Sequence, residues 1–160
     1  MIQKTLRECC IINDLEGVKL LIENGADINA KDIIGSTALI NSSEYNRIEI
    51  IKLLIENGAD INAKDNDGNT ALMLACCCGY SDILKLLIEK GADVNAKDND
   101  GKTALMVVCR WSCTEIVKIL IDSGADVNVK DNKGKTALEI ASYYDHIETV
   151  KLLIDNGVRQ

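Results

Sequence analysis

The chain has 160 residues, a formal net charge of −7, 47% hydrophobic residues and only 3% aromatic residues. The acidic balance argues against a protein that binds nucleic acid or a membrane surface, because a phosphate backbone is contacted through clustered lysine and arginine side chains. No apolar run is long enough to span a membrane, and the first ten residues do not resemble a signal peptide. We therefore expect a cytoplasmic protein, or one that acts inside a host cell if it is exported by other means.

A period of 33 residues runs through the chain. Each period carries a glycine suited to the end of a helix, a glycine in a tight turn, and a threonine followed by Ala-Leu. The first set comprises Gly25, Gly58, Gly91, Gly124 and Gly157, the second comprises Gly35, Gly68, Gly101 and Gly134, and the threonines are Thr37, Thr70, Thr103 and Thr136. Such a period is typical of stacked-repeat proteins, in which each unit buries its apolar face against its neighbours.

In chain order, five units follow one another without a linker, so we expect a single domain over residues 1–160. The first unit, residues 1–31, has no turn. Its residues Met1 to Cys10 are expected to supply a first helix, and Leu15 to Asn24 the second. Units 32–64, 65–97 and 98–130 are complete, each with an Asp-x-x-Gly turn, a short apolar helix and a longer amphipathic helix. The fifth unit, residues 131–160, stops just past its second helix.

The 33-residue length, the D-x-x-G-x-T-x-L opening and the I-V-K-L-L-I-x-x-G-A-D-V-N-A-K close resemble the ankyrin repeat along essentially the whole chain. The chain departs from the family in the T-P-L-H tetrapeptide, where for example Ala38 and Ile40 replace Pro and His. The loss of proline removes a preset φ at the start of the first helix. The resemblance implies an all-α ankyrin-repeat solenoid of about five stacked helix-turn-helix units with β-turn tips.

One position recurs just before the second helix of every unit. Four of the five residues at this position are of types that tolerate a left-handed backbone. The five residues are Asn13, Asn46, Gly79, Ser112 and Asp145. An acid follows three positions later, so the position either closes the first helix or caps the second. Thr136 and Glu139 form a capping box for the first helix of the fifth unit, and His146 is expected to be a hydrogen-bonding cap and not a catalyst.

The terminal units are expected to cap the stack. Gly17 and Thr149 stand where the middle units have isoleucine, and small or polar residues suit a face that no neighbour covers. The last helix keeps Leu152, Leu153 and Ile154, so part of its apolar surface is expected to stay in water or to meet another chain.

The second unit is expected to be the least stable. Its first helix has Asn41 where the third unit has Leu74, which removes roughly 1.5–3 kcal/mol of apolar burial and risks an unpaired polar group.

Positions that differ between units are the candidates for binding, since the repeated positions hold the stack together. Four of the five aromatic residues fall at the ends of first helices, and Tyr, Trp and Arg are enriched in binding hot spots. The resemblance implies a concave groove that grips a partner protein. Its candidate residues at the helix ends are Tyr45, Cys77, Cys78, Arg110, Trp111, Tyr143 and Tyr144, and at the turns they are Ile33, Ile34, Asn66, Asp67, Asn99, Asp100 and Lys102. The alternative is that these side chains only cover gaps between units.

The turns differ in character along the chain. Ile33 and Ile34 are apolar where the other tips are polar, and they either anchor a partner or pack on the first unit. The later tips pass through acidic residues to Lys102, Lys133 and Lys135, a gradient that would orient a partner by complementary charge. Solvated turns without a role are the alternative.

No catalytic, metal or cofactor site is expected. Cys76, Cys77 and Cys78 are consecutive on a helix, where neighbouring side chains point about 100° apart and cannot converge on one ion. Cys10, Cys76 and Cys109 share a small-residue position and are expected to be buried, whereas Cys77, Cys78 and Cys113 are expected to be more exposed. The odd total of seven cysteines favours a reducing compartment.

Asn29, Asn62, Asn95 and Asn128 are expected to bond the loop backbone.

Together these features predict a monomeric, non-catalytic module that binds a partner protein and needs no cofactor. Two alternatives remain open. One is a structural element that associates weakly with itself through the last unit, and the other is a targeting domain of a larger effector or enzyme.

Overall fold

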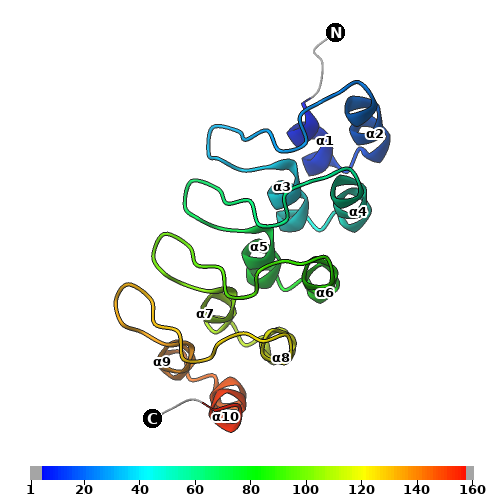
Figure 1. Ribbon diagram of the computed structural model, residues 1–160. Helices are drawn as coiled ribbons and strands as arrows, with labels where there is room; N and C mark the ends of the chain where they lie inside the picture. Colours follow the sequence, from blue (N-terminus) through cyan, green and yellow to red (C-terminus); the bar gives the residue numbers. More distant parts are fainter. Residues whose placement is uncertain (1–4, 158–160) are drawn as a thin grey trace.

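The computed structural model describes residues 5–157, which form a row of helix pairs (Figure 1). In this part of the chain there are ten α-helices and no strand: α1 Leu6–Ile12, α2 Leu15–Glu23, α3 Ala38–Glu44, α4 Ile48–Glu56, α5 Ala71–Cys78, α6 Ser81–Glu89, α7 Ala104–Val108, α8 Thr114–Asp122, α9 Ala137–Tyr143 and α10 Ile147–Asp155. The odd-numbered helices form one layer, from which the hairpin loops project, and the even-numbered helices form the other. This arrangement confirms the predicted all-α solenoid.

A threonine cap starts each helix of the first layer, although the proline that usually follows it is absent. In each of these helices the residue before the first turn is an extended threonine whose hydroxyl accepts a hydrogen bond from a backbone N–H three residues on, as Thr37 does from Ile40 at 3.3 Å. The capping box predicted for Thr136 and Glu139 is present, and Thr5 and Glu8 form a second one that the sequence analysis did not anticipate.

In four of the five units the left-handed position closes the first helix and does not cap the second. Asn13 and Gly79 are C-caps with φ of 63° and 81°. In four units the next residue donates its N–H to a carbonyl five residues back, as Tyr80 does to Ala75 at 3.0 Å. The fourth unit lacks this bond because Ser112 does not adopt a positive φ, a conformation costly for a residue with a Cβ. In the same unit α7 ends early, at Val108.

Asparagine side chains bond the loop backbone, as predicted, and the loop they bond belongs to the next unit. Asn62 Oδ1 accepts from the Asp93 N–H at 2.8 Å, and its Nδ2 donates to the Gly91 carbonyl at 3.3 Å. Asn29 and Asn95 make the equivalent pairs. The hairpins form a second ladder, in which the Asn99 N–H donates to the Asp67 carbonyl at 3.0 Å.

The capping role predicted for Gly17 and Thr149 is wrong. Thr149 is only 1% exposed, and its hydroxyl has no hydrogen-bond partner in the described residues. A Cβ at Gly17 would lie 2.7 Å from the Asp14 carboxylate and 2.9 Å from Cys9 Sγ, so this glycine makes room for the α2 cap. The open face instead carries exposed aliphatic residues, among them Ile154, as expected for the last helix.

Asn41 is buried, as its alignment with an apolar position implies, but it is not unpaired. Its side chain is 2% exposed, and Nδ2 donates to the Thr37 carbonyl at 2.9 Å. The hydrogen bond satisfies the polar group without restoring the apolar burial that leucine would give. The relative stability of the second unit stays a prediction.

Candidate partner-binding surface

The residues that vary between units form what we call the variable strip: the hairpin tips, the residue after each hairpin glycine, and the residues that follow or end the first-layer helices. All seven helix-end candidates are exposed, as are all the turn candidates except half-buried Lys102. Arg110 and Trp111 lie in a turn and not on a helix end, because α7 stops at Val108. Trp111 is 52% exposed in this turn.

Hairpin and helix end meet within a unit. In the fifth unit Lys135 Nζ lies 5.6 Å from the ring centroid of Tyr143. In the fourth, the pKa of Lys102 is raised, chiefly by its hydrogen bond to Asp100 at 2.6 Å, while the nearby positive charge of Arg110 opposes the shift. A partner that contacts the hairpins of these units would therefore reach their helix ends as well.

Asn66 and Asn99 are partly occupied by the stack. Their Nδ2 atoms donate to the carbonyls of Ile33 at 3.2 Å and Asn66 at 2.8 Å. These amide nitrogens join neighbouring hairpins, which leaves Asp67 and Asp100 as the exposed charged groups at the two tips.

A cluster of rings and cations lies at the C-terminal end of the strip. Tyr143 and Tyr144 pack edge to face with centroids 5.1 Å apart, and Tyr144 stacks on His146 at 6.0 Å. His146 Nε2 lies 3.2 Å from the Arg110 carbonyl, which links the fifth unit to the fourth. We call Arg110, Trp111, Lys135, Tyr143, Tyr144 and His146 the C-terminal cluster.

The role predicted for His146 as a helix cap is wrong. It precedes α10 but its side chain makes no cap hydrogen bond. Arg47 occupies the same position in the second unit and also reaches back one unit, donating from Nη2 to the Ile11 carbonyl at 2.8 Å. The 33-residue register aligns these two residues, but sequence alone does not reveal which backbone carbonyl lies opposite.

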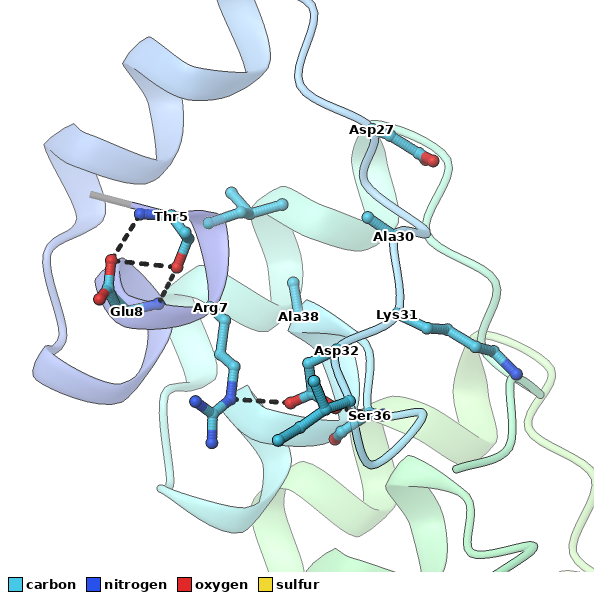
Figure 2. A pocket seen from close by; sticks show the side chains of 11 residues that line it. Thr5, Arg7, Glu8, Asp27, Ala30, Lys31, Asp32, Ser36 and Ala38 are labelled. Atoms are coloured by element: carbon cyan, nitrogen blue, oxygen red, sulfur yellow. Dashed lines mark hydrogen bonds and ion pairs between the residues drawn. The ribbon is translucent and has the colours of Figure 1, made fainter. Parts of the chain in front are cut away.

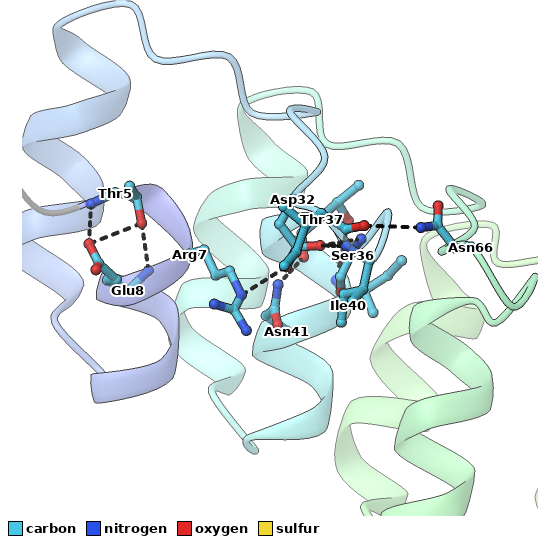
Figure 3. A network of polar contacts seen from close by, with 11 residues as sticks. Thr5, Arg7, Glu8, Asp32, Ser36, Thr37, Ile40, Asn41 and Asn66 are labelled. Atoms are coloured by element: carbon cyan, nitrogen blue, oxygen red, sulfur yellow. Dashed lines mark hydrogen bonds and ion pairs between the residues drawn. The ribbon is translucent and has the colours of Figure 1, made fainter.

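A pocket of about 680 Å³ lies at the other end of the stack, where the first unit has no hairpin (Figure 2). It is lined by α1 and by residues between Asp27 and Ala38. Arg7 Nε pairs with Asp32 Oδ2 at 2.8 Å, while Asp32 Oδ1 accepts from the backbone N–H groups of Ile34 and Ser36, both at 2.9 Å (Figure 3). The pocket was not predicted, although the missing turn of the first unit indicates it.

Ile33 and Ile34 do not pack on the first unit. Ile33, which lines the pocket, is 98% exposed, and Ile34 is 54% exposed. The packing alternative is therefore wrong, and an apolar tip stands at the N-terminal end of the variable strip.

The cysteines follow the predicted division. Cys10, Cys76 and Cys109 are buried, and burial raises the pKa of Cys10 to about 11, that of Cys109 to about 12 and that of Cys76 as well. Cys77 and Cys78 are exposed and Cys113 is half-buried. Within residues 5–157, no group of three potential metal-ligating side chains converges, and no helix is both long and apolar enough to cross a membrane.

Comparison with curated protein sequences finds no relative that matches the chain. The family model for ankyrin repeats in three copies matches residues 6–98 and again residues 93–160. Ankyrin repeats generally mediate protein–protein interaction. The observed row of helix pairs with projecting hairpins agrees with this match. The chain belongs to the ankyrin repeat family.

Proposed function

We propose that the chain binds a partner protein along the variable strip and carries out no catalysis of its own. The observation that carries this proposal is the exposure of Arg110, Trp111, Tyr143 and Tyr144, whereas the fully buried core of the described residues holds no aromatic ring. Aromatic and arginine side chains dominate the binding energy of protein interfaces when they are buried by a partner. Hairpin and helix-end side chains face the same partner in this arrangement, because Lys135 lies over Tyr143.

The test is a pull-down that compares the chain with its Arg110→Ala/Trp111→Ala variant. Loss of a hot-spot pair should weaken capture of a specific partner by about 2 kcal/mol or more. A matched control, Leu20→Ala/Lys118→Ala, removes one exposed apolar and one cationic side chain from α2 and α8, away from the strip. Equal capture by all three proteins would refute the assignment.

The reducing cytoplasm is the compartment that suits this function. None of the cysteines in the described residues forms a disulfide, and exposed Cys77 and Cys78 would oxidise outside a reducing environment. The same argument covers the interior of a host cell.

Self-association through the last unit is the second candidate function. Ile147 and Ile154 on α10 are 64% and 44% exposed, on the face that a sixth unit would otherwise approach. Sedimentation velocity over a range of concentrations separates the two: a monomer at all concentrations supports the partner-binding module, and a mass that rises with concentration supports self-association. A targeting domain within a larger effector or enzyme would use the same variable strip.

A further inference from the structure

The cations at the C-terminal end of the strip form no ion pair. This holds for Arg110, Lys133 and Lys135 among the described residues, although the whole chain carries a net charge of −7. The pKa of Asp100 is lowered chiefly by its hydrogen bond to Lys102 and to a smaller extent by the charge of Lys133, and the pKa of Glu139 is lowered chiefly by its hydrogen bonds from Thr136 and to a smaller extent by Lys135. Nearby acids also serve the fold. Asp131 Oδ1 accepts from the N–H groups of Lys133 and Lys135, both at 2.8 Å, and the Glu139 carboxylate accepts from the Thr136 N–H at 2.7 Å.

The rings of the same region are held in place before any partner arrives. Tyr143 contacts Lys135 on one side and Tyr144 on the other, and Tyr144 stacks on His146. Because these side chains already contact one another, a partner that covers them loses little of its binding energy to ordering them. Tyr143 is still 75% exposed and therefore has apolar surface to bury.

The N-terminal half of the strip has a different character. Glu44 and Asp67 are exposed there, and so are Ile33 and Ile34 of the apolar tip. The negative charge of Glu44 reaches the helix end of the next unit, since it contributes to the raised pKa of Cys78, after burial and Cys77. Unpaired positive charge is thus a local property of the last two units and not of the strip as a whole.

We infer that the C-terminal cluster, together with Lys133, binds an acidic segment of a partner protein in which carboxylates flank an apolar side chain. The proposal rests on the proposed function of the variable strip and adds the chemistry of the partner. Arg110 and the two lysines bind the carboxylates, and Trp111 and Tyr143 cover the apolar side chain. A nucleic acid fits less well, because three unpaired cations give a small phosphate footprint and the net charge of −7 repels a polyanion.

The experiment selects binders from a random peptide library displayed against the full chain, and counts Asp and Glu among the enriched sequences. A protein of this net charge attracts basic peptides by default, so enrichment in acidic peptides points to a local site. An enriched peptide is then synthesised and its affinity measured for the chain and for the Lys133→Glu/Lys135→Glu variant. We expect the variant to bind at least about tenfold more weakly.

Two further variants sharpen the measurement. Lys118→Glu/Lys151→Glu makes the same change in net charge on exposed lysines of α8 and α10, and should leave the affinity nearly unchanged. Asp145 adds an exposed negative charge beside Tyr144, in a left-handed conformation that asparagine also adopts at Asn13 and Asn46. Asp145→Asn should therefore bind the acidic peptide more tightly without disturbing the fold, which circular dichroism verifies for every variant.

The outcomes separate this inference from the proposed function. If the selected peptides are neutral or basic and the Arg110→Ala/Trp111→Ala variant no longer binds them, the proposed preference for acidic segments is wrong. The variable strip is still the binding surface in that case. Peptides insensitive to every strip variant, or no enrichment at all, count against both. If the control variant Lys118→Glu/Lys151→Glu lowers the affinity for the acidic peptide equally, the effect is due to net charge and the inference is wrong. A single-stranded oligonucleotide that competes as well as a peptide of equal charge also overturns the inference.

Discussion

The first and last hairpins of the stack share one backbone plan but present different side chains. In both, an aspartate at the start of the turn accepts hydrogen bonds from two backbone N–H groups within the turn, as Asp32 and Asp131 do. The first hairpin then exposes Ile33 and Ile34 beside a pocket, whereas the last exposes lysines beside a pair of tyrosines. One scaffold can therefore carry different surfaces, because the residues that hold the turn are not the ones that face outward.

The largest expected effect comes from the glycines of these two hairpins. Gly35 and Gly134 have nearly the same φ, +75° and +77°. A Cβ at Gly35 would lie 2.7 Å from the Asn66 backbone nitrogen, whereas at Gly134 it would meet nothing within 4 Å. Gly134→Ala should cost about 1–2 kcal/mol through the left-handed backbone alone. Gly35→Ala should cost about 3 kcal/mol or more, because it also breaks the hairpin ladder.

Urea denaturation of the two alanine variants measures this difference directly. Since the backbone strain is common to both, the excess loss at Gly35 reports the close approach of the next hairpin. Equal losses would show that the ladder does not constrain the first hairpin.

The second unit should open before the third. Asn41→Leu should stabilise the protein by about 1–2 kcal/mol, since the position is buried and the side chain only bonds its own helix. Hydrogen exchange should show α3 amides less protected than α5 amides in the original chain, and the gap should narrow in the variant. The reciprocal Leu74→Asn change serves as the control, and equal protection of α3 and α5 at the outset would contradict the prediction.

Ser112 offers a test at the C-terminal end. Ser112→Gly should restore the left-handed closure that the other units have, lengthen α7 and raise stability by about 1 kcal/mol. Ser112→Ala, which gains no such freedom, is the matched control. Thermal unfolding measures the gain, and the fluorescence of Trp111 reports whether its surroundings change. A glycine variant no more stable than the alanine variant would show that the early end of α7 has another cause.

The smallest effect belongs to the ion pair beside the N-terminal pocket. Arg7 and Asp32 are 46% and 17% exposed, so Arg7→Ala should cost less than about 1 kcal/mol, and the loss should shrink in high salt. Arg7→Lys is the control, because it keeps the charge but loses the planar guanidinium. A salt-independent loss would assign the role of Arg7 to packing.

The fold could be predicted from the sequence because the period is regular and each unit repeats the same turn and helix-end residues. The capping box of Thr136 and Glu139 could be predicted from residue type and spacing, and so could the bonding of Asn62 and its equivalents to the loop backbone. The partners lie within a few residues in the first case and in the next copy of the same motif in the second. Prediction was less successful where a residue departs from the repeat. Gly17 and Thr149 suggested a solvated face, but Gly17 lies against Asp14 and Cys9, and Thr149 is buried.

The amino-acid sequence by itself determined the number of units, their helix pairs and the positions free to vary, because these follow from periodicity and local propensity. Only the tertiary structure decided that Ile33 stays exposed, that His146 bonds the preceding unit and that Lys135 lies over Tyr143. Each of these facts depends on which atoms an adjacent element brings opposite the side chain. How close these atoms lie to the side chain depends on how neighbouring units pack, and not on the spacing of residues along the chain.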